Sequence, residues 1–425
     1  MKTIVVAIRL IVFGLVSLRG AEYVFHLFNK YFKGGTPCHV VIQNWVLRFG
    51  LYKLKQMPEK RKDWVYILDH TIDFGAKKCL LVLGITLECF RNAKCEIKHN
   101  DMEILAINIV EKATATSVTK VLRDVSKSTG VPVQVLSDDG VNIKKGVNDF
   151  IDEKKVLFSI RRTYDVTHKT ALILKHHLKD DTQWKLFVDY ACKTKRSLVH
   201  TPLAYLAPPK PKDKARWMNL EPYINWAEKI LSLTLKNIEK ENHERFKSEL
   251  RWIRKFRKSI DEWRTILNLL QALKKEIKSF GFSKDTKKNF EKTIIELDLK
   301  TGRLVSIKEE ILVYIDQECK DIDGVYPGCS DIIESVIGKY KTFSSRSPMK
   351  EVGKAVLTMP VFTSSIDPLE VKEAMESVSD KDLKKWLNEN IGQSLFSKRK
   401  EVFSLKKIKT PINKNRQKLK KAASF

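Results

Sequence analysis

WVYILDHT, residues 64–71, is the stretch that decides which fold this sequence predicts. It is a short β-branched and aromatic run that ends in a carboxylate, Asp69, as is typical of a buried strand that delivers an acid to the edge of a sheet. A second run of this kind, residues 131–136 (VPVQVL), is followed by Asp138, and a third carboxylate, Glu334, lies on a predicted helix far downstream. Three such carboxylates can hold a pair of hard divalent cations, which prefer oxygen ligands.

Size and charge favour a nucleic-acid partner. The chain has 425 residues, enough for two or three domains, and 79 Lys and Arg against 51 Asp and Glu, a formal net charge of +28. Each cationic side chain placed on a phosphate releases a condensed counterion, so this excess favours binding to a polyanion. The alternative is a generally basic, soluble surface. The seven cysteines include no Cys-x-x-Cys pair, which argues against a disulfide scaffold or thiolate zinc site and fits a reducing cytoplasm.

The amino end carries an apolar run, residues 4–13 (IVVAIRLIVF), that is similar to a signal peptide. Arg9 interrupts the run, no small-residue cleavage site follows it cleanly, and it is too short to span a bilayer. We therefore expect a buried helix and no membrane partner.

Residues 1–54 predict a compact helical module. Ser17 can cap a second helix, Thr36 can cap a third, and Gly50 stands where the third helix would end. This pattern is like a helix-turn-helix, and its third helix would present polar side chains to a DNA groove, namely Gln43, Asn44 and Arg48. The alternative is a helical cap packed on the main domain.

A basic linker leads to a segment that predicts three strands, a helix, a strand, a helix and a strand. The strands are expected at residues 64–71, 79–87, 103–110, 131–136 and 156–160, and the helices at 116–128 and 144–150. This is the order of the ribonuclease H-like fold, an α/β fold with a mixed sheet flanked by helices. In that fold the first and fourth strands are neighbours, which would bring Asp69 and Asp138 together.

The remaining chain predicts a long insertion. The interval between Asp138 and Glu334 is far longer than one strand and one helix require. Apolar residues recur at three- and four-residue steps over 246–270, which predicts one long helix with basic outer faces. The predicted organisation is a helix-turn-helix-like module (1–54), the first part of a catalytic core (55–178), an α-helical insertion (179–324), the end of the core with the Glu334 helix (325–396) and a basic, disordered tail (397–425).

Several motifs resemble those of one enzyme family. Four stretches look like the motif blocks of bacterial insertion-sequence transposases of the DDE type: WVYILDH (64–70), LSDDG (136–140), YDVTHK (164–169) and IIESVIGKYK (332–341). The resemblance spans most of the chain and implies metal-dependent DNA strand cleavage and transfer, with an acidic triad of Asp69, Asp138 and Glu334. Related families place Tyr and Arg before the Glu and Lys after it. Here Pro327 and Ser330 occupy the first two places, and only Lys341 matches.

The predicted metal site has three expected ligands, and a nearby carboxylate is an alternative to each of them. Asp69 would bridge two ions, while Asp138 and Glu334 would each hold one. Magnesium is the expected ion, with manganese as a substitute, because an all-carboxylate site lacks the ligands that favour zinc. The rival carboxylates are Asp73, Asp139 and Asp331.

Other polar residues near these motifs are candidates for supporting roles. Lys341 lies two helical turns after Glu334 and could meet a phosphate beside the metals, and Lys339 and Lys169 are further candidates for DNA contact. Asp165 and His168 could support the metal ligands through hydrogen bonds, contact DNA or cap a helix. The adjacent pair His176 and His177 is expected at ordinary helix-surface positions, since neighbouring helical residues point in different directions.

The sequence therefore predicts a transposase that binds the ends of its element and target DNA, as a homodimer or larger assembly, in a bacterial cytoplasm beside the nucleoid. A ribonuclease H-like nuclease that cleaves without joining and a catalytically inactive DNA-binding protein are the alternatives.

Overall fold

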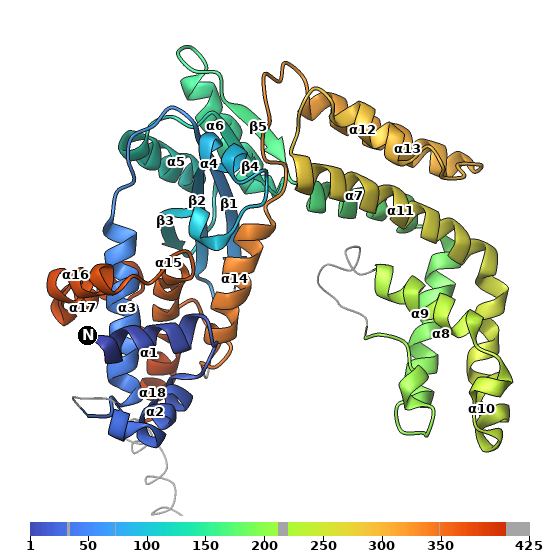
Figure 1. The fold of residues 1–425 in the computed structure, drawn as a ribbon, viewed down its shortest axis with the longest axis horizontal. Coiled ribbons are helices and arrows are strands. Elements are labelled where there is room, and N and C mark those ends of the chain that lie inside the picture. Colours follow the sequence, from blue (N-terminus) through green and yellow to red (C-terminus); the bar gives the residue numbers. More distant parts are fainter. Residues whose placement is uncertain (32–34, 73, 211–219, 348, 405–425) are drawn as a thin grey trace, which may run out of the picture.

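The computed structural model describes residues 1–31, 35–72, 74–210, 220–347 and 349–404. One half of the molecule is built around a five-stranded sheet (Figure 1). Its strands run in the order β3-β2-β1-β4-β5, with β2 antiparallel to its neighbours β1 and β3, β4 parallel to β1, and β5 parallel to β4. The bounds are β1 Trp64–Ile72, β2 Lys78–Thr86, β3 Glu103–Val110, β4 Gln134–Ser137 and β5 Arg161–Tyr164. This mixed sheet, flanked by helices, is the predicted ribonuclease H-like fold.

The fifth strand begins later than expected. Residues 156–160 were predicted as a strand, but Val156 and Leu157 are among the most exposed apolar residues, and β5 starts at Arg161, opposite Gln134. A short apolar run does not by itself determine a strand, because pairing with β4 selects which residues join the sheet.

Two helices cover one face of the sheet, α5 (Ala115–Thr129) and α6 (Val141–Lys154) (Figure 1). Alternate residues of β1 point to this side, because successive side chains of a strand face opposite ways. The core on this face is made by Trp64, Tyr66, Leu68, Val118, Leu122, Val147 and Phe150.

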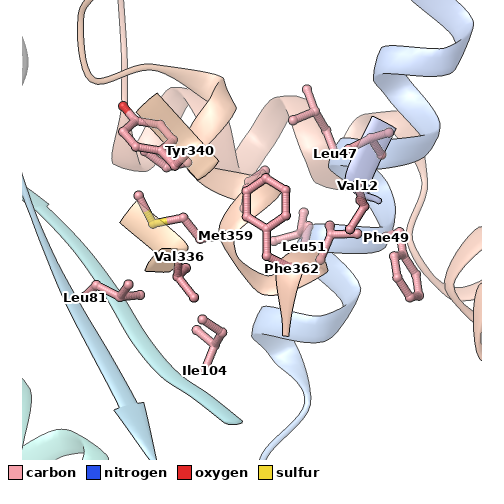
Figure 2. Packing of buried hydrophobic residues seen from close by; sticks show 14 of the residues in the cluster. Val12, Leu47, Phe49, Leu51, Leu81, Ile104, Val336, Tyr340, Met359 and Phe362 are labelled. Atoms are coloured by element: carbon pink, nitrogen blue, oxygen red, sulfur yellow. The ribbon is translucent and has the colours of Figure 1, made fainter. Parts of the chain in front are cut away.

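The opposite face packs against helices from both ends of the chain. These are α1 (Lys2–Val12), α2 (Leu18–Leu27), α3 (His39–Lys55), α14 (Asp331–Ser344) and α15 (Met359–Phe362). Figure 2 shows Leu81 and Ile104 of the sheet in one cluster with Val336 of α14 and Leu51 of α3. The apolar faces of α1, α2 and α3 help to complete the core beneath the sheet, as in the predicted alternative of a helical cap. The buried first helix is confirmed, with Ile8 and Ile11 inside.

The third helix differs from the prediction at both ends. Ser17 caps α2 as expected, accepting a hydrogen bond from the amide of Gly20 at 2.9 Å, but α3 begins after Cys38 and not after Thr36. Nor does Gly50 end α3. A Cβ atom there would lie 1.8 Å from the carbonyl oxygen of Leu357, so glycine permits the close approach of the carboxyl-terminal segment.

The predicted insertion forms a second, helical body with its own core (Figure 1). Its helices are α8 (Thr182–Leu198), α9 (Leu220–Ser232), α10 (His243–Leu250), α11 (Arg257–Phe280), α12 (Thr286–Thr293) and α13 (Gly302–Glu318), and α7 (Val166–Leu178) joins them from the sheet. The apolar stripe predicted over 246–270 is buried, although a 3-10 segment, Arg251–Phe256, interrupts the single helix expected there.

Shorter elements complete the fold. They are α4 (Leu87–Asn92), α16 (Pro368–Ser377), α17 (Asp380–Asn390) and α18 (Leu395–Val402). Most of the predicted basic tail, residues 405–425, lies outside the described part of the chain. None of the helices in the described ranges combines the length and apolar character needed to cross a bilayer.

Candidate active site

Parallel pairing of β1 and β4 brings the first two candidate carboxylates together. Leu68 of β1 is paired with Ser137, the last residue of β4, and each is followed in the chain by an aspartate, Asp69 or Asp138. Both faces of β1 are buried, so the register is set by which side chains fill each core: Trp64, Tyr66 and Leu68 on one face, Val65 and Ile67 on the other. The pairing therefore places the two acids side by side, Asp138 directly after the end of β4 and Asp69 within β1, which continues to Ile72.

The third carboxylate comes from α14, which packs beneath β1. Glu334 lies in the first turn of this helix, and its side chain is 41% exposed. Its Oε1 lies 3.8 Å from Nδ1 of His168. Asp69 and Asp138 both interact electrostatically with the same imidazole. We call Asp69, Asp138 and Glu334 the acidic site.

The environment of the acidic site resists the accumulation of negative charge. Burial and the neighbouring charge of Asp138 raise the pKa of Asp69 to about 7. Burial also raises the pKa of Asp138 and that of Glu334. One buried oxygen of Asp138, Oδ1, has no hydrogen-bond partner among the described residues. Carboxylates gathered in this way are stabilised in their charged form by a bound cation.

Binding of divalent ions by these three carboxylates stays a prediction. In the described chain, the three carboxylates do not form a set whose ligand atoms all lie within 4.8 Å of one another. The predicted arrangement does not require that, because Asp69 alone would be shared while Asp138 and Glu334 would serve different ions. Magnesium and manganese suit these oxygen donors.

Asp165 and His168 connect α7 to the acidic site. Asp165 is fully buried; its Oδ1 accepts a hydrogen bond from the His168 amide at 2.8 Å and lies 3.1 Å from His168 Nδ1. Its Oδ2 accepts from the amide and hydroxyl of Ser330 at 2.5 and 2.9 Å. Burial opposes protonation of His168, but the hydrogen bond to Asp165 and the charges of Asp165, Asp138 and Glu334 raise its pKa to about 9. Asp165 thus caps α7 and holds the start of α14.

Two of the rival carboxylates have cationic partners of their own. Asp139 forms ion pairs with Arg162 and with Lys144, the latter at 3.2 Å. Despite its burial, the pKa of Asp331 is held below its usual value by hydrogen bonds from Lys278 and Thr167. These contacts favour Asp138 and Glu334 over their rivals. The third rival, Asp73, lies outside the described residues.

The candidates for DNA contact on α3 contact the protein's own carboxyl-terminal segment. Arg48 donates hydrogen bonds to the carbonyls of Met375 and Val378, both at 2.6 Å. Asn44 Nδ2 lies 3.2 Å from Asp380 Oδ1, and Gln43 Oε1 lies 2.6 Å from Lys354 Nζ. Their contact with DNA stays a prediction, and in this structure they hold helices together.

The candidate lysines occupy different surroundings. Lys341 is exposed on α14. Lys339 is half-buried, its Nζ is 5.7 Å from the ring centre of Phe362, and burial lowers its pKa. Lys169 is bound to Glu310 at 3.1 Å. Of the three, Lys341 is the most accessible to a phosphate.

The sequence did not predict two of these contacts. The Asp165–Ser330 contact joins residues far apart in the chain, and the only sequence signal was the acid at the end of a strand in YDVTHK. The pairing of Arg162 with Asp139 likewise depends on β5 lying beside β4.

Comparisons with known proteins add a likeness of fold. No protein-family model matches the chain, and no curated protein matches it. Among solved structures it is similar to a chain of the Drosophila P element transposase strand transfer complex, with a TM-score of 0.43 and 12% sequence identity, over 87% of this chain and 92% of that one. At this identity and TM-score the likeness carries no functional argument. What the chain's own strand order defines is a ribonuclease H-like protein with an acidic site where β4 ends beside β1.

Proposed function

We propose that this chain is a DNA transposase of the DDE type, in which Asp69, Asp138 and Glu334 are the metal ligands for DNA strand cleavage and transfer. The proposal rests on one observation: Asp69 and Asp138 follow paired residues of β1 and β4, and burial together with the Asp138 and Glu334 charges raises the pKa of Asp69. Acids gathered at a buried site to hold cations are typical of enzymes that transfer phosphoryl groups.

The net charge of +28 supports DNA as the substrate. Lys341, exposed two turns after Glu334 on α14, would contact a phosphate beside the acidic site. Because two element ends must be cut and joined together, we propose a homodimer or larger assembly on DNA. An origin in a bacterial insertion sequence, with the protein acting beside the nucleoid, belongs to the same proposal.

Each reaction step exchanges one phosphorus–oxygen bond for another. In cleavage, water attacks a backbone phosphorus and the bond to the 3′ oxygen breaks, leaving a 3′-hydroxyl and a 5′-phosphate. In joining, that 3′-hydroxyl attacks a target phosphorus and displaces the target's own 3′ oxygen. Two Mg²⁺ ions, or Mn²⁺ in their place, would promote ionisation of the attacking hydroxyl and stabilise the leaving oxygen.

The protein's part in these steps is to hold the acids and the DNA in place. Asp69, Asp138 and Glu334 would hold the ions through their carboxylate oxygens. Asp165 is a positioning residue, because its hydrogen bonds to Ser330 fix the end of α14 from which Glu334 projects. A carboxylate placed in this way loses little freedom when its ion binds.

The test is a cleavage-and-joining assay on a supercoiled plasmid that carries the DNA flanking the gene. Native protein is compared with Glu334→Gln, which keeps the shape and removes the charge, and with Glu376→Gln, the same change at an exposed position on α16. We expect Mg²⁺-dependent nicking and joined products from the native chain and Glu376→Gln, and neither from Glu334→Gln, with DNA binding retained by all three. Cleavage without joined products would indicate a nuclease. Binding without cleavage by native protein would indicate a DNA-binding protein.

A further inference from the structure

A second group of potential metal ligands lies away from the acidic site, where the end of α7 meets α13. It consists of His176 and His177 from α7 and Glu310 from α13, and we call it the histidine site. One atom from each residue can be chosen so that all three lie within 4.8 Å of one another. It is the only such group in the parts of the chain that the structure describes. The sequence predicted two unremarkable surface histidines, but the fold directs both toward one carboxylate.

We propose that the histidine site binds one borderline transition-metal ion, Zn²⁺ being the expected ion, and that this ion fastens α7 to α13. Two imidazoles and a carboxylate are the donors of many three-residue zinc sites, in which a water or another ligand fills the fourth position. This proposal is independent of the proposed transposase function.

Two of the distances between the side chains of the histidine site suit ligands of one metal ion. His176 Nδ1 and His177 Nε2 each lie 3.3 Å from the same oxygen, Oε2 of Glu310. Each contact is within hydrogen-bond range, although longer than the ~2.7–2.9 Å of a charge-assisted hydrogen bond. This separation matches the edge of a tetrahedron, about 3.3–3.4 Å, whose centre is a zinc ion about 2.0–2.1 Å from each ligand. Each pair is therefore already spaced as two ligands of one ion.

Lys169 orients the carboxylate of Glu310. Its other oxygen, Oε1, accepts an ion-paired hydrogen bond from Lys169 at 3.1 Å, which leaves Oε2 directed at the two imidazoles. The Lys169 ammonium itself lies 5.8 Å from the ring centre of Tyr314, on α13. Partners that hold a ligating carboxylate in this way are a regular part of metal sites.

The histidine site is open to solvent on the side of His176, so a metal ion and a fourth ligand can reach it. The His176 side chain is 69% exposed, whereas His177 is 13% and Glu310 25% exposed. An ion can therefore reach the site from solvent while two of its ligands remain fixed in the protein. Asp165, the N-cap of α7, already binds Ser330 at the start of α14. An ion at the histidine site would fasten the other end of α7 to α13.

The experiment titrates the full-length protein with Co²⁺, a spectroscopic substitute for Zn²⁺, in a large excess of Mg²⁺, which would compete with Co²⁺ for the acidic site. The variants are His177→Ala, Glu310→Gln and His176→Ala, with His200→Ala as the matched control at an exposed histidine. The shift of the melting temperature with Zn²⁺ is measured on the same set. The His176 side chain is mostly in solvent, so His176→Ala should fold normally and test the site even if the other variants misfold.

We expect one equivalent of Co²⁺, a visible spectrum without thiolate charge-transfer bands, and a Zn²⁺-dependent rise in melting temperature. Affinity should fall at least 10-fold in each of the three site variants and be unchanged in His200→Ala. The proposal is overturned if native protein takes up neither ion, if the spectrum shows thiolate ligands, or if the site variants bind as the native chain does. Loss of DNA cleavage by Glu334→Gln has no bearing on this result.

Discussion

The buried carboxylate of Asp165 accepts hydrogen bonds from both the amide and the hydroxyl of Ser330, one helical turn before Glu334. The same carboxylate caps α7 through the amide of His168. One side chain thereby joins the start of α7 to the start of the helix that carries the third acid.

Asp165→Asn should therefore reduce both stability and cleavage. An amide has one acceptor oxygen where the carboxylate has two, so a buried donor at Ser330 or His168 loses its partner at a cost of about 2–4 kcal/mol. We expect a lower midpoint in urea unfolding and slower Mg²⁺-dependent cleavage, with DNA affinity retained. Asp152→Asn, at an exposed acid paired with Lys155, is the control and should change neither. Unaltered cleavage by Asp165→Asn would show that this contact does not position Glu334.

Asp138→Asn and Asp139→Asn should have opposite consequences. Asp138 faces the acidic site with an unpartnered oxygen, so its amide variant should lose cleavage by about 100-fold or more while remaining folded. Asp139 is bound by Arg162 and Lys144, so its variant should keep the activity and lose about 1–3 kcal/mol of stability. Parallel plasmid-nicking and unfolding measurements on the two variants decide the question. The reverse pattern would make Asp139 the ligand.

The stability of the metal-free protein should depend on pH through Asp69. Its carboxyl keeps a proton up to about pH 7 in the folded state, whereas the ordinary pKa is 3.8. Between these values the folded state binds more protons than the unfolded state, so the free energy of unfolding falls as pH rises, by up to about 1.4 kcal/mol per pH unit. Asp69→Asn should flatten this fall between pH 4.5 and 6.5. His168, with a pKa raised above 6.5, stays charged there in both states for most of this range.

Magnesium should reverse that trend in the native chain, because it competes with the proton on Asp69. The rise in melting temperature on adding Mg²⁺ should be larger at pH 7.5 than at pH 5.5, and it should be lost in Asp69→Asn. Thermal unfolding at the two pH values, with and without Mg²⁺, provides the measurement. An equal rise at both pH values in native and variant protein would mean that Mg²⁺ binds elsewhere.

Arg48→Ala should act mainly on stability. This guanidinium donates hydrogen bonds to the carbonyls of Met375 and Val378. Its loss leaves both carbonyls without their charged donor, which should lower the free energy of unfolding by about 1.5–3 kcal/mol. The salt dependence of DNA affinity, measured on folded protein, tests the predicted contact of Arg48 with DNA. Arg19→Ala, at an exposed position on α2, is the control. A reduced salt slope in Arg48→Ala alone would instead support the predicted role of α3 in DNA binding.

The sequence by itself determined the elements and their chemistry. Apolar runs ending in acid located β1 and β4, helical spacing located α14 and the buried stripe of the insertion, and strand order gave the fold. These features are local, because a strand or helix is specified by the period of its apolar residues. The expectation that Asp69 and Asp138 are neighbours followed from the same strand order.

The tertiary structure decided what each element packs against. It packed α1, α2 and α3 with the carboxyl-terminal helices, moved β5 to Arg161, and turned Gly50 from a helix end into a close contact. It also joined Asp165 to Ser330, Arg162 to Asp139, and the two histidines to Glu310. Such pairings depend on the shape of a shared core and on which charges are buried within it, and no local pattern in the sequence encodes them.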